Sequence, residues 1–264
     1  MTRKVSRRRD GRKGLARLVF VTGTDTGVGK TLVTALLLHH LRQRGCHALA
    51  MKPFCSGGTQ DVDLLHRLQQ GELSRREINP FYFAEPVAPL VAARRRRRRI
   101  SAGDVLRRIR AVQKRCGCLL IEGAGGLMAP LGEKFLVADL IAALDCNVVI
   151  VARNKLGTIN HVLLTAEALA RCGLSRIKIA LLECKRRDLA ARTNAKVLAE
   201  WLSPMEVVGL PFLGARANTV SAVKRNCKKI KKGLARISDF ASLCALFKRS
   251  GKKAVRKKAI DSWR

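Results

Sequence analysis

The sequence has no run of about 18 uncharged apolar residues, the length that a membrane-spanning helix needs. We therefore expect neither a membrane span nor a signal-peptide core before the first apolar stretch. Paired CxxC spacing is also missing, and the nine cysteines lie scattered through apolar stretches. This pattern is typical of reduced thiols rather than of disulfides or a zinc site. We expect a cytoplasmic protein.

Acidic residues are scarce: 19 Asp and Glu face 53 Lys and Arg, a formal net charge of +34. Well over half of this excess lies in residues 1–17, in the Arg94–Arg99 run and from Lys224 onwards. Six adjacent arginines repel one another, which favours an extended, solvated segment. We interpret the two ends as solvated extensions as well. Nonspecific polyanion binding by these tails, or a transit peptide at the start, are the alternatives.

Between the basic ends, β-branched runs alternate with segments of helical period, which predicts βαβ units and a mostly parallel sheet with helices on both faces. Strands are predicted at Leu18–Thr22, Ala48–Lys52, Leu119–Glu122, Val148–Ala152, Ile177–Leu182 and Glu206–Leu210. Long helices are predicted at Lys30–Arg44, Ala102–Arg115, Thr158–Cys172 and Leu189–Leu202. The chain length suits one α/β domain.

We place this domain at residues 18–223, between a basic N-terminal extension at 1–17 and a basic C-terminal extension at 224–264. Residues 57–99 show no clear alternation, which predicts mostly loop with one short helix near Val62–Gln69. Apolar residues around Phe240–Phe247 predict one packed helix within the C-terminal extension.

A glycine-rich turn, Gly23–Thr31, follows the first predicted strand and leads directly into the first predicted helix. This order is what a P-loop requires, because glycines let the backbone wrap phosphate oxygens and the helix N-terminus adds its N–H groups and dipole. Lys30 is then expected over the β- and γ-phosphates, and the Thr31 hydroxyl on Mg²⁺. The predicted nucleotide-binding residues are Asp25, Thr26, Gly27, Val28, Gly29, Lys30 and Thr31.

Four ordered blocks narrow the class of P-loop protein: Gly23–Thr31, Lys52–Gly57, Glu122–Leu127 and Leu156–His161. Together they resemble the dethiobiotin synthetase family over about residues 18–214, and four blocks in order are more specific than any one. The resemblance implies a P-loop NTPase-like fold and an enzyme of biotin biosynthesis that uses ATP and Mg²⁺. Its reaction joins carbon dioxide to 7,8-diaminopelargonic acid and closes a cyclic urea.

The resemblance also assigns roles to residues. Catalysis is expected from Lys30, Lys52 and Ser56, because an ammonium at the end of a strand beside the loop can stabilise a carbamate to which Ser56 also donates. The implied Mg²⁺ ligands are Thr31, Asp63 and Glu122, and Asp61 is the close alternative to Asp63.

Substrate binding is expected from Ser56, Gly123, Thr158, Ile159 and Asn160. The last three open a predicted helix, where exposed N–H groups can hold a carboxylate. The family uses this loop largely from the opposite subunit, so the resemblance implies a homodimer with the substrate site near its interface.

The sequence differs from the family at a position that binds the nucleotide base. The family has an asparagine after the fifth predicted strand, and this chain has Leu182-Glu183. Glu183 can accept from an exocyclic amine and Pro211 can provide an apolar wall, which leaves the base selectivity open.

Two rival functions share the fold class. One is a ParA- or MinD-like partner-switching ATPase whose basic tails hold DNA or a membrane, but the early second lysine usual in that loop is missing here. The other is an ATP-dependent amidation or ligase domain acting on another acid, against which the Leu156–His161 block argues.

Overall fold

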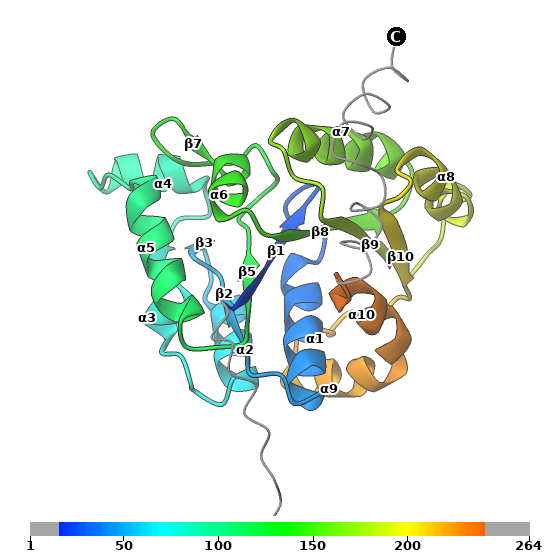
Figure 1. Cartoon of the computed structure of the whole chain (residues 1–264), viewed down its shortest axis with the longest axis horizontal. Coiled ribbons are helices and arrows are strands. Elements are labelled where there is room, and N and C mark those ends of the chain that lie inside the picture. Colours follow the sequence, from blue (N-terminus) through cyan, green and yellow to red (C-terminus); the bar gives the residue numbers. More distant parts are fainter. Residues whose placement is uncertain (1–15, 241–264) are drawn as a thin grey trace, which may run out of the picture.

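The computed structural model of the chain describes residues 16–240, and Figure 1 shows a central six-stranded sheet between two layers of helices. Its strands are β1 (Arg17–Gly23), β2 (Ala48–Met51), β5 (Cys118–Glu122), β8 (Asn147–Asn154), β9 (Ile177–Glu183) and β10 (Glu206–Leu210). All neighbours pair in parallel, in the order β10-β9-β8-β1-β5-β2. The predicted α/β fold is confirmed, and all six predicted strands form, although β2 ends just before Lys52.

One helical layer consists of α1 (Lys30–Gln43), α9 (Val220–Lys229) and α10 (Lys231–Ser238). The other consists of α5 (Ala102–Gln113), α6 (Val137–Leu144), α7 (Thr158–Arg171) and α8 (Asn194–Trp201). The predicted helix Leu189–Leu202 is split, since a 3-10 turn, η1 (Ala190–Arg192), precedes α8. Asn194 marks the start of α8, because its side chain donates to Asn154 Oδ1 at 2.9 Å and is thereby fixed to β8.

The segment between β2 and α5 contains more regular structure than the sequence predicts. It forms β3 (Phe54–Ser56), α2 (Gln60–Leu68), α3 (Arg75–Ile78), β4 (Phe81–Phe83) and α4 (Pro89–Arg95). Most of these elements are too short to show a period. Local signals define two of them instead: a Ser74–Glu77 capping box opens α3, and Pro89 occupies the first turn of α4.

The Arg94–Arg99 run is not fully extended, contrary to the prediction, because its first two residues complete the last turn of α4. Arg94 forms two hydrogen bonds with Glu133, at 2.8 and 2.7 Å, and Glu85 pairs with Arg95 at 2.5 Å. These carboxylates offset the repulsion among the arginines, and cations at a helix C-terminus interact favourably with its dipole.

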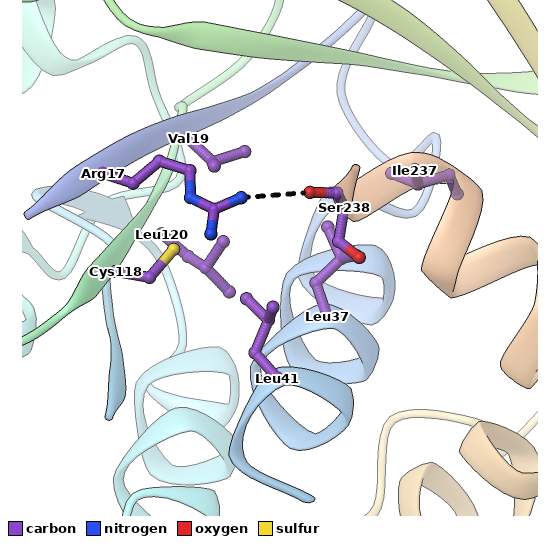
Figure 2. Close-up of a pocket in the computed structure, with 8 residues that line it drawn as sticks. All are labelled: Arg17, Val19, Leu37, Leu41, Cys118, Leu120, Ile237 and Ser238. Atoms are coloured by element: carbon purple, nitrogen blue, oxygen red, sulfur yellow. Dashed lines mark hydrogen bonds between the residues drawn. The ribbon is translucent and has the colours of Figure 1, made fainter. Parts of the chain in front are cut away.

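The predicted domain end at Val223 falls inside α9, and packed residues continue beyond it. The buried apolar side chains of this part are Val223, Cys227, Ile230, Leu234, Ile237 and Phe240. Figure 2 shows the end of α10 beside β1 and α1, where Arg17 donates to the Ser238 carbonyl at 3.4 Å. The domain therefore extends at least to Phe240. The rest of the helix predicted around Phe240–Phe247 lies outside the described residues, as do residues 1–15 of the predicted N-terminal extension.

A buried lysine ties α10 to the sheet. Lys178 on β9 pairs with Glu206 Oε2 at 2.8 Å and donates to the carbonyl of Arg236. Its ammonium also lies 5.3 Å from the centre of the Phe240 ring. Because a buried ammonium must keep its partners, these contacts fix the position of α10.

The order of the strands determines where a ligand can bind. The chain builds β2 and β5 on one side of β1 and then crosses to β8 on the other side. In open α/β sheets, ligands bind at such a switch point, outside the carboxyl ends of the strands. Within residues 16–240, no helix combines the length and the apolar character needed to cross a membrane.

Candidate active site

The phosphate loop lies between β1 and α1, at the centre of the sheet. Gly27 and Gly29 have left-handed backbones, with φ of 70° and 106°. A Cβ on Gly29 would lie 2.3 Å from Leu182 Cδ1, so this position accepts only glycine without rearrangement. The predicted loop thus leads into α1 through two residues whose positive φ favours glycine.

Lys30 folds back onto this loop. Its ammonium donates to the Asp25 carbonyl at 2.8 Å, and the Asp25 carboxylate accepts from the Thr26 amide at 2.6 Å. Burial disfavours the charged ammonium and lowers the pKa of Lys30 to about 8, although the Glu122 carboxylate works in the opposite direction. A phosphate group beside it would raise this pKa again, because an anion favours the charged form.

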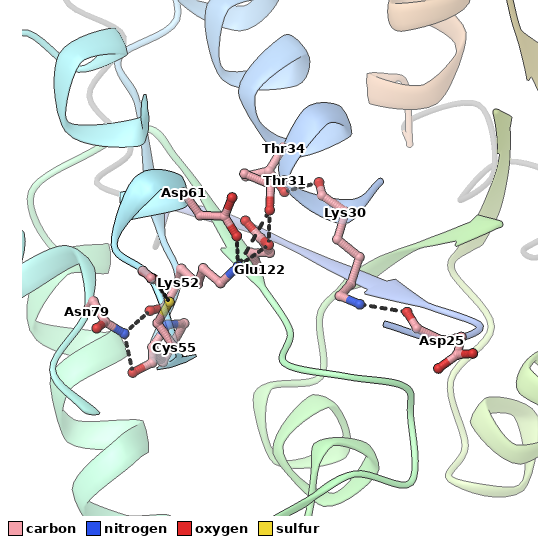
Figure 3. A network of polar contacts seen from close by, with 11 residues as sticks. Asp25, Lys30, Thr31, Thr34, Lys52, Cys55, Asp61, Asn79 and Glu122 are labelled. Atoms are coloured by element: carbon pink, nitrogen blue, oxygen red, sulfur yellow. Dashed lines mark hydrogen bonds and ion pairs between the residues drawn. The ribbon is translucent and has the colours of Figure 1, made fainter. Parts of the chain in front are cut away.

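Four side chains converge beside the loop, as Figure 3 shows. Glu122 Oε1 accepts from the Thr31 hydroxyl at 2.6 Å and from the Lys52 ammonium at 2.9 Å, and Lys52 also pairs with Asp61. Burial opposes the charge of Lys52, but the carboxylates of Glu122 and Asp61 outweigh it and raise the pKa of this lysine above its ordinary value. The ammonium therefore stays charged.

Different elements bring these four residues together. Glu122 ends β5, Thr31 lies in the first turn of α1, and Asp61 lies in the first turn of α2. The backbone at Lys52 is held by Asn79, whose amide donates to the Lys52 carbonyl at 2.7 Å. Neighbouring parallel strands thus deliver their terminal polar residues to one edge of the sheet.

The structure does not bring Asp63 to this cluster. Its carboxylate accepts from Arg75 Nε at 2.6 Å, and this hydrogen bond lowers the pKa of Asp63. Asp61 occupies the place expected for Asp63. Residues two apart on a helix point in different directions, so only one of the two can face Glu122.

The cluster and the loop line one cleft of about 880 Å³. Predicted residues in its wall are Thr26, Gly27, Gly29, Lys30, Thr31, Lys52, Ser56, Glu122 and Gly123. Pro86–Pro89 and residues 124–129 also belong to the wall. Asp25 and Val28 belong to the loop but do not line the cleft.

Residues Thr158, Ile159 and Asn160 lie at the start of α7, outside the wall of this cleft. The buried Thr158 hydroxyl donates to the Arg153 carbonyl, so it already has an internal partner. Asn160 is exposed. Within a single chain, the predicted carboxylate-binding loop is therefore separate from the cluster around Lys52.

Glu183 and Pro211, predicted near the nucleotide base, also lie outside the wall of the cleft. Glu183 accepts from Asn154 Nδ2 at 2.8 Å and pairs with Arg187 at 2.9 Å. Leu182, its neighbour, packs beneath the phosphate loop against Gly29. The side chain of Glu183 thus has internal partners in this structure.

Sequence reasoning missed two contributions to the site. Arg153, at the end of β8, donates to the Gly27 carbonyl, and no motif pointed to it. Leu164, Thr165 and Ala168 of α7, together with Met128, also line the cleft. The one-turn spacing of Leu164 and Ala168 within a predicted helix was the only available signal for this wall.

Comparisons with known proteins agree on the class. A family model described as an AAA domain matches residues 17–213. A Bacillus velezensis protein named ATP-dependent dethiobiotin synthetase BioD is 40% identical over 200 residues, which cover 74% of this chain and 85% of that protein. A protein of the same name from an Anaeromyxobacter species is 43% identical over 188 residues, which cover 69% and 84% of the two chains.

Among solved structures, the MinC:MinD cell division protein complex of Aquifex aeolicus aligns with a TM-score of 0.51 and 13% identity, over 80% of this chain and 86% of that one. So distant a likeness shows the fold alone. The phosphate loop, Lys52 and Glu122 line one cleft. The two dethiobiotin synthetases are 40% and 43% identical to this chain over most of their own length. The chain therefore belongs to the dethiobiotin synthetase family.

Proposed function

We propose that this protein makes dethiobiotin from 7,8-diaminopelargonic acid, carbon dioxide and ATP, in biotin biosynthesis. The observation that carries the proposal is the position of Lys52. Its ammonium lies 2.9 Å from Glu122, in the same cleft as the phosphate loop. A cation there can face a carbamate on one side and the γ-phosphate of ATP on the other.

ATP is the nucleotide of the proposal, bound through the residues of the phosphate loop. Lys30 would exchange the Asp25 carbonyl for the β- and γ-phosphates, and the N-terminus of α1 would add its amides and dipole. The buried position of Lys30 strengthens this contact, because electrostatic attraction is larger away from bulk water. The base would lie toward β9, with Glu183 and Pro211 as the proposed contacts.

Mg²⁺ fits the cluster beside the loop. Glu122 Oε2 is buried and has no hydrogen-bond partner among residues 16–240, which leaves it free to ligate a cation. No group of three or more His, Cys, Asp or Glu side chains suited to a metal ion occurs within the described residues. Thr31, Glu122 and Asp61 would therefore share the ion with phosphate oxygens and water, as hard Mg²⁺ prefers. Bound there, Mg²⁺ would neutralise charge on the phosphates.

The proposed chemistry has three steps. One amine of the substrate adds to carbon dioxide and loses a proton, which gives a carbamate held by Lys52 and Ser56. A carbamate oxygen then attacks the γ-phosphorus and ADP leaves, while Lys30 stabilises charge on the transferring group. The second amine attacks the carbon of the phosphorylated carbamate, the C–O bond to phosphate breaks, and the nitrogen gives up a proton to the departing phosphate as the ring closes.

A second copy of the chain would complete the substrate site. The loop at Thr158, Ile159 and Asn160 does not line the cleft of its own chain, although the amides of Ile159 and Asn160 at the helix N-terminus are suited to a carboxylate. Large apolar side chains near the cleft are exposed, among them Met128 at 62% and Leu164 at 61%. Burial of these side chains would favour a homodimer that brings the loop of one subunit to the cleft of the other.

We also propose that the protein acts in the cytoplasm, and that its basic termini bind polyanions without sequence preference. Lys and Arg that neutralise phosphates give such binding a steep dependence on salt. The partner-switching ATPase is the weaker alternative, since the MinD likeness shows the fold alone and the loop lacks the early lysine.

Product analysis tests the proposal. Purified protein incubated with the diamine, bicarbonate, Mg²⁺ and ATP should yield dethiobiotin and ADP, as measured by mass spectrometry. Lys52→Met should lower the rate at saturating ATP by about 100-fold or more, while ATP still binds. Lys196→Met, which removes an exposed lysine on α8, is the matched control and should keep the wild-type rate. Failure of the wild-type protein to form dethiobiotin would refute the proposed function.

A further inference from the structure

Arg153 makes an unusual contact with the phosphate loop. It stands near the carboxyl end of β8, and its guanidinium donates twice to the Gly27 carbonyl, from Nε at 3.1 Å and from Nη2 at 2.8 Å. A guanidinium fork ordinarily binds a carboxylate or a phosphate. Within residues 16–240, Arg153 forms no ion pair with a carboxylate. Both donors of the fork are therefore directed at one neutral carbonyl of the loop.

This contact fixes the orientation of one peptide group. The peptide bond is planar and trans, so the Gly27 carbonyl and the Val28 amide point in opposite directions. A Gly27 carbonyl held by Arg153 therefore directs the Val28 N–H away from the guanidinium. Backbone amides of this kind bind phosphate oxygens in a P-loop. The side chain of Val28 is buried and packs against Gly23, which fixes the position of this residue in the loop.

The rest of the loop explains why such a support is needed. Gly27 has a φ of 70°, and a Cβ built there would meet nothing within 4 Å, so the apex has little packing of its own. The entry of the loop is tied to β8 by the Thr24 amide, which donates to the Val151 carbonyl at 3.1 Å. Val151 and Arg153 are two residues apart on β8, so one short stretch of this strand makes both contacts. β8 thus holds both the entry and the apex of the loop.

We propose that Arg153 is a positioning residue for nucleotide binding and phosphoryl transfer. It acts through the Val28 amide: the fork sets the direction of this donor before the nucleotide arrives, and the adjacent positive charge polarises the peptide and strengthens the donor. The inference rests on the proposed ATP site and adds to it a residue of β8 that does not belong to the phosphate loop.

Binding and kinetics of matched variants test this role. Arg153→Ala should weaken the binding of Mg²⁺ with a non-hydrolysable ATP analogue, measured by calorimetry, and raise the KM for ATP, each by about tenfold. Arg153→Lys keeps one charged donor and should recover part of the affinity. The KM for the diamine and the melting temperature should stay at the wild-type values, because the contact serves only the phosphate loop.

Arg176→Ala is the control, since Arg176 also donates to a backbone carbonyl, that of Asp145 at 2.6 Å, and does not line the cleft. This variant should bind the analogue like the wild type. The inference is wrong if Arg153→Ala binds the analogue within twofold of the wild type. It is also wrong if the KM values for ATP and the diamine rise together with a lower melting temperature, which would indicate a general structural role.

The proposed function and this inference fail in different ways. A wild-type protein that forms no dethiobiotin, combined with selective loss of analogue binding in Arg153→Ala, would refute the function and support the role of Arg153. If the wild-type protein forms dethiobiotin and Arg153→Ala binds the analogue as tightly as the wild type, the function is supported and the role of Arg153 is refuted.

Discussion

A chain that ends at Val223 should fail to fold, because it lacks most of α9 and all of α10. The shortening removes five buried apolar side chains, namely Cys227, Ile230, Leu234, Ile237 and Phe240. Burying each side chain of this kind contributes about 1.5–3 kcal/mol, so the loss is on the order of 10 kcal/mol. Whole domains are stable by only about 5–15 kcal/mol. The predicted loss is therefore as large as the entire free energy of unfolding.

The same shortening uncovers Lys178. Its side chain is 1% exposed and would lose the Arg236 carbonyl and the ring of Phe240. Among residues 16–223, Glu206 would remain as its partner. Removing partners from a buried charge adds to the destabilisation. The apolar loss and this electrostatic loss act on the same face of the sheet.

Thermal unfolding followed by circular dichroism measures the effect. A chain that ends at Phe240 is the control, because it keeps every contact described above and should melt cooperatively. Ile237→Ala in the full chain gives a milder version, with an expected loss of about 2–5 kcal/mol in the free energy of unfolding. Cooperative melting of the Val223 chain within a few degrees of the control would refute the reasoning.

Other predictions concern the phosphate loop and its neighbours. Because burial lowers the pKa of Lys30 to about 8, ATP affinity should fall as the pH rises through that value and the ammonium loses its proton, whereas Lys30→Arg should show no such fall in a binding titration. Asp61→Asn should raise the Mg²⁺ concentration needed for half-maximal activity by about tenfold or more, and Asp63→Asn should leave it unchanged; the opposite ranking would favour Asp63 as the ligand. Gly29→Ala should abolish detectable binding of the ATP analogue, since the new Cβ would lie 2.3 Å from Leu182 Cδ1, and wild-type affinity would show that the loop adapts.

Much of the fold follows from local patterns in the sequence. The strand before Gly23–Thr31 and the helix after it were predictable, because buried parallel strands are apolar throughout and a glycine-rich turn separates them from an apolar helix. The positions of Lys52 and Glu122 also followed, since residues at the ends of neighbouring parallel strands meet at one edge of the sheet.

Other features depend on contacts between distant segments. Asp61 and Asp63 are equivalent in composition and spacing, and only the way α2 packs beside Lys52 decides which of them faces the cluster. The support of Gly27 by Arg153 joins residues 126 positions apart in the sequence, and no local pattern announces it. The predicted end of the domain was too early. Val223, Ile230 and Ile237 recur every seven residues, as expected of one helical face, but the many lysines between them make the segment look like a solvated tail.

Lys52 has a consequence for how the site takes up cations. Its ammonium lies between Asp61 and Glu122, so the two carboxylates already have a counter-ion that is covalently attached to the chain. A tethered ion competes at a high effective concentration, which a free ion in solution must overcome. A divalent cation alone should therefore bind weakly, and one that arrives with the phosphates of a nucleotide should bind well, because those phosphates supply the additional negative charge. When the divalent cation and the nucleotide bind, Asp61 and Glu122 would turn to the cation and the Lys52 ammonium would be released toward the cleft. Lys52 would then be available to the second substrate only when the nucleotide is bound.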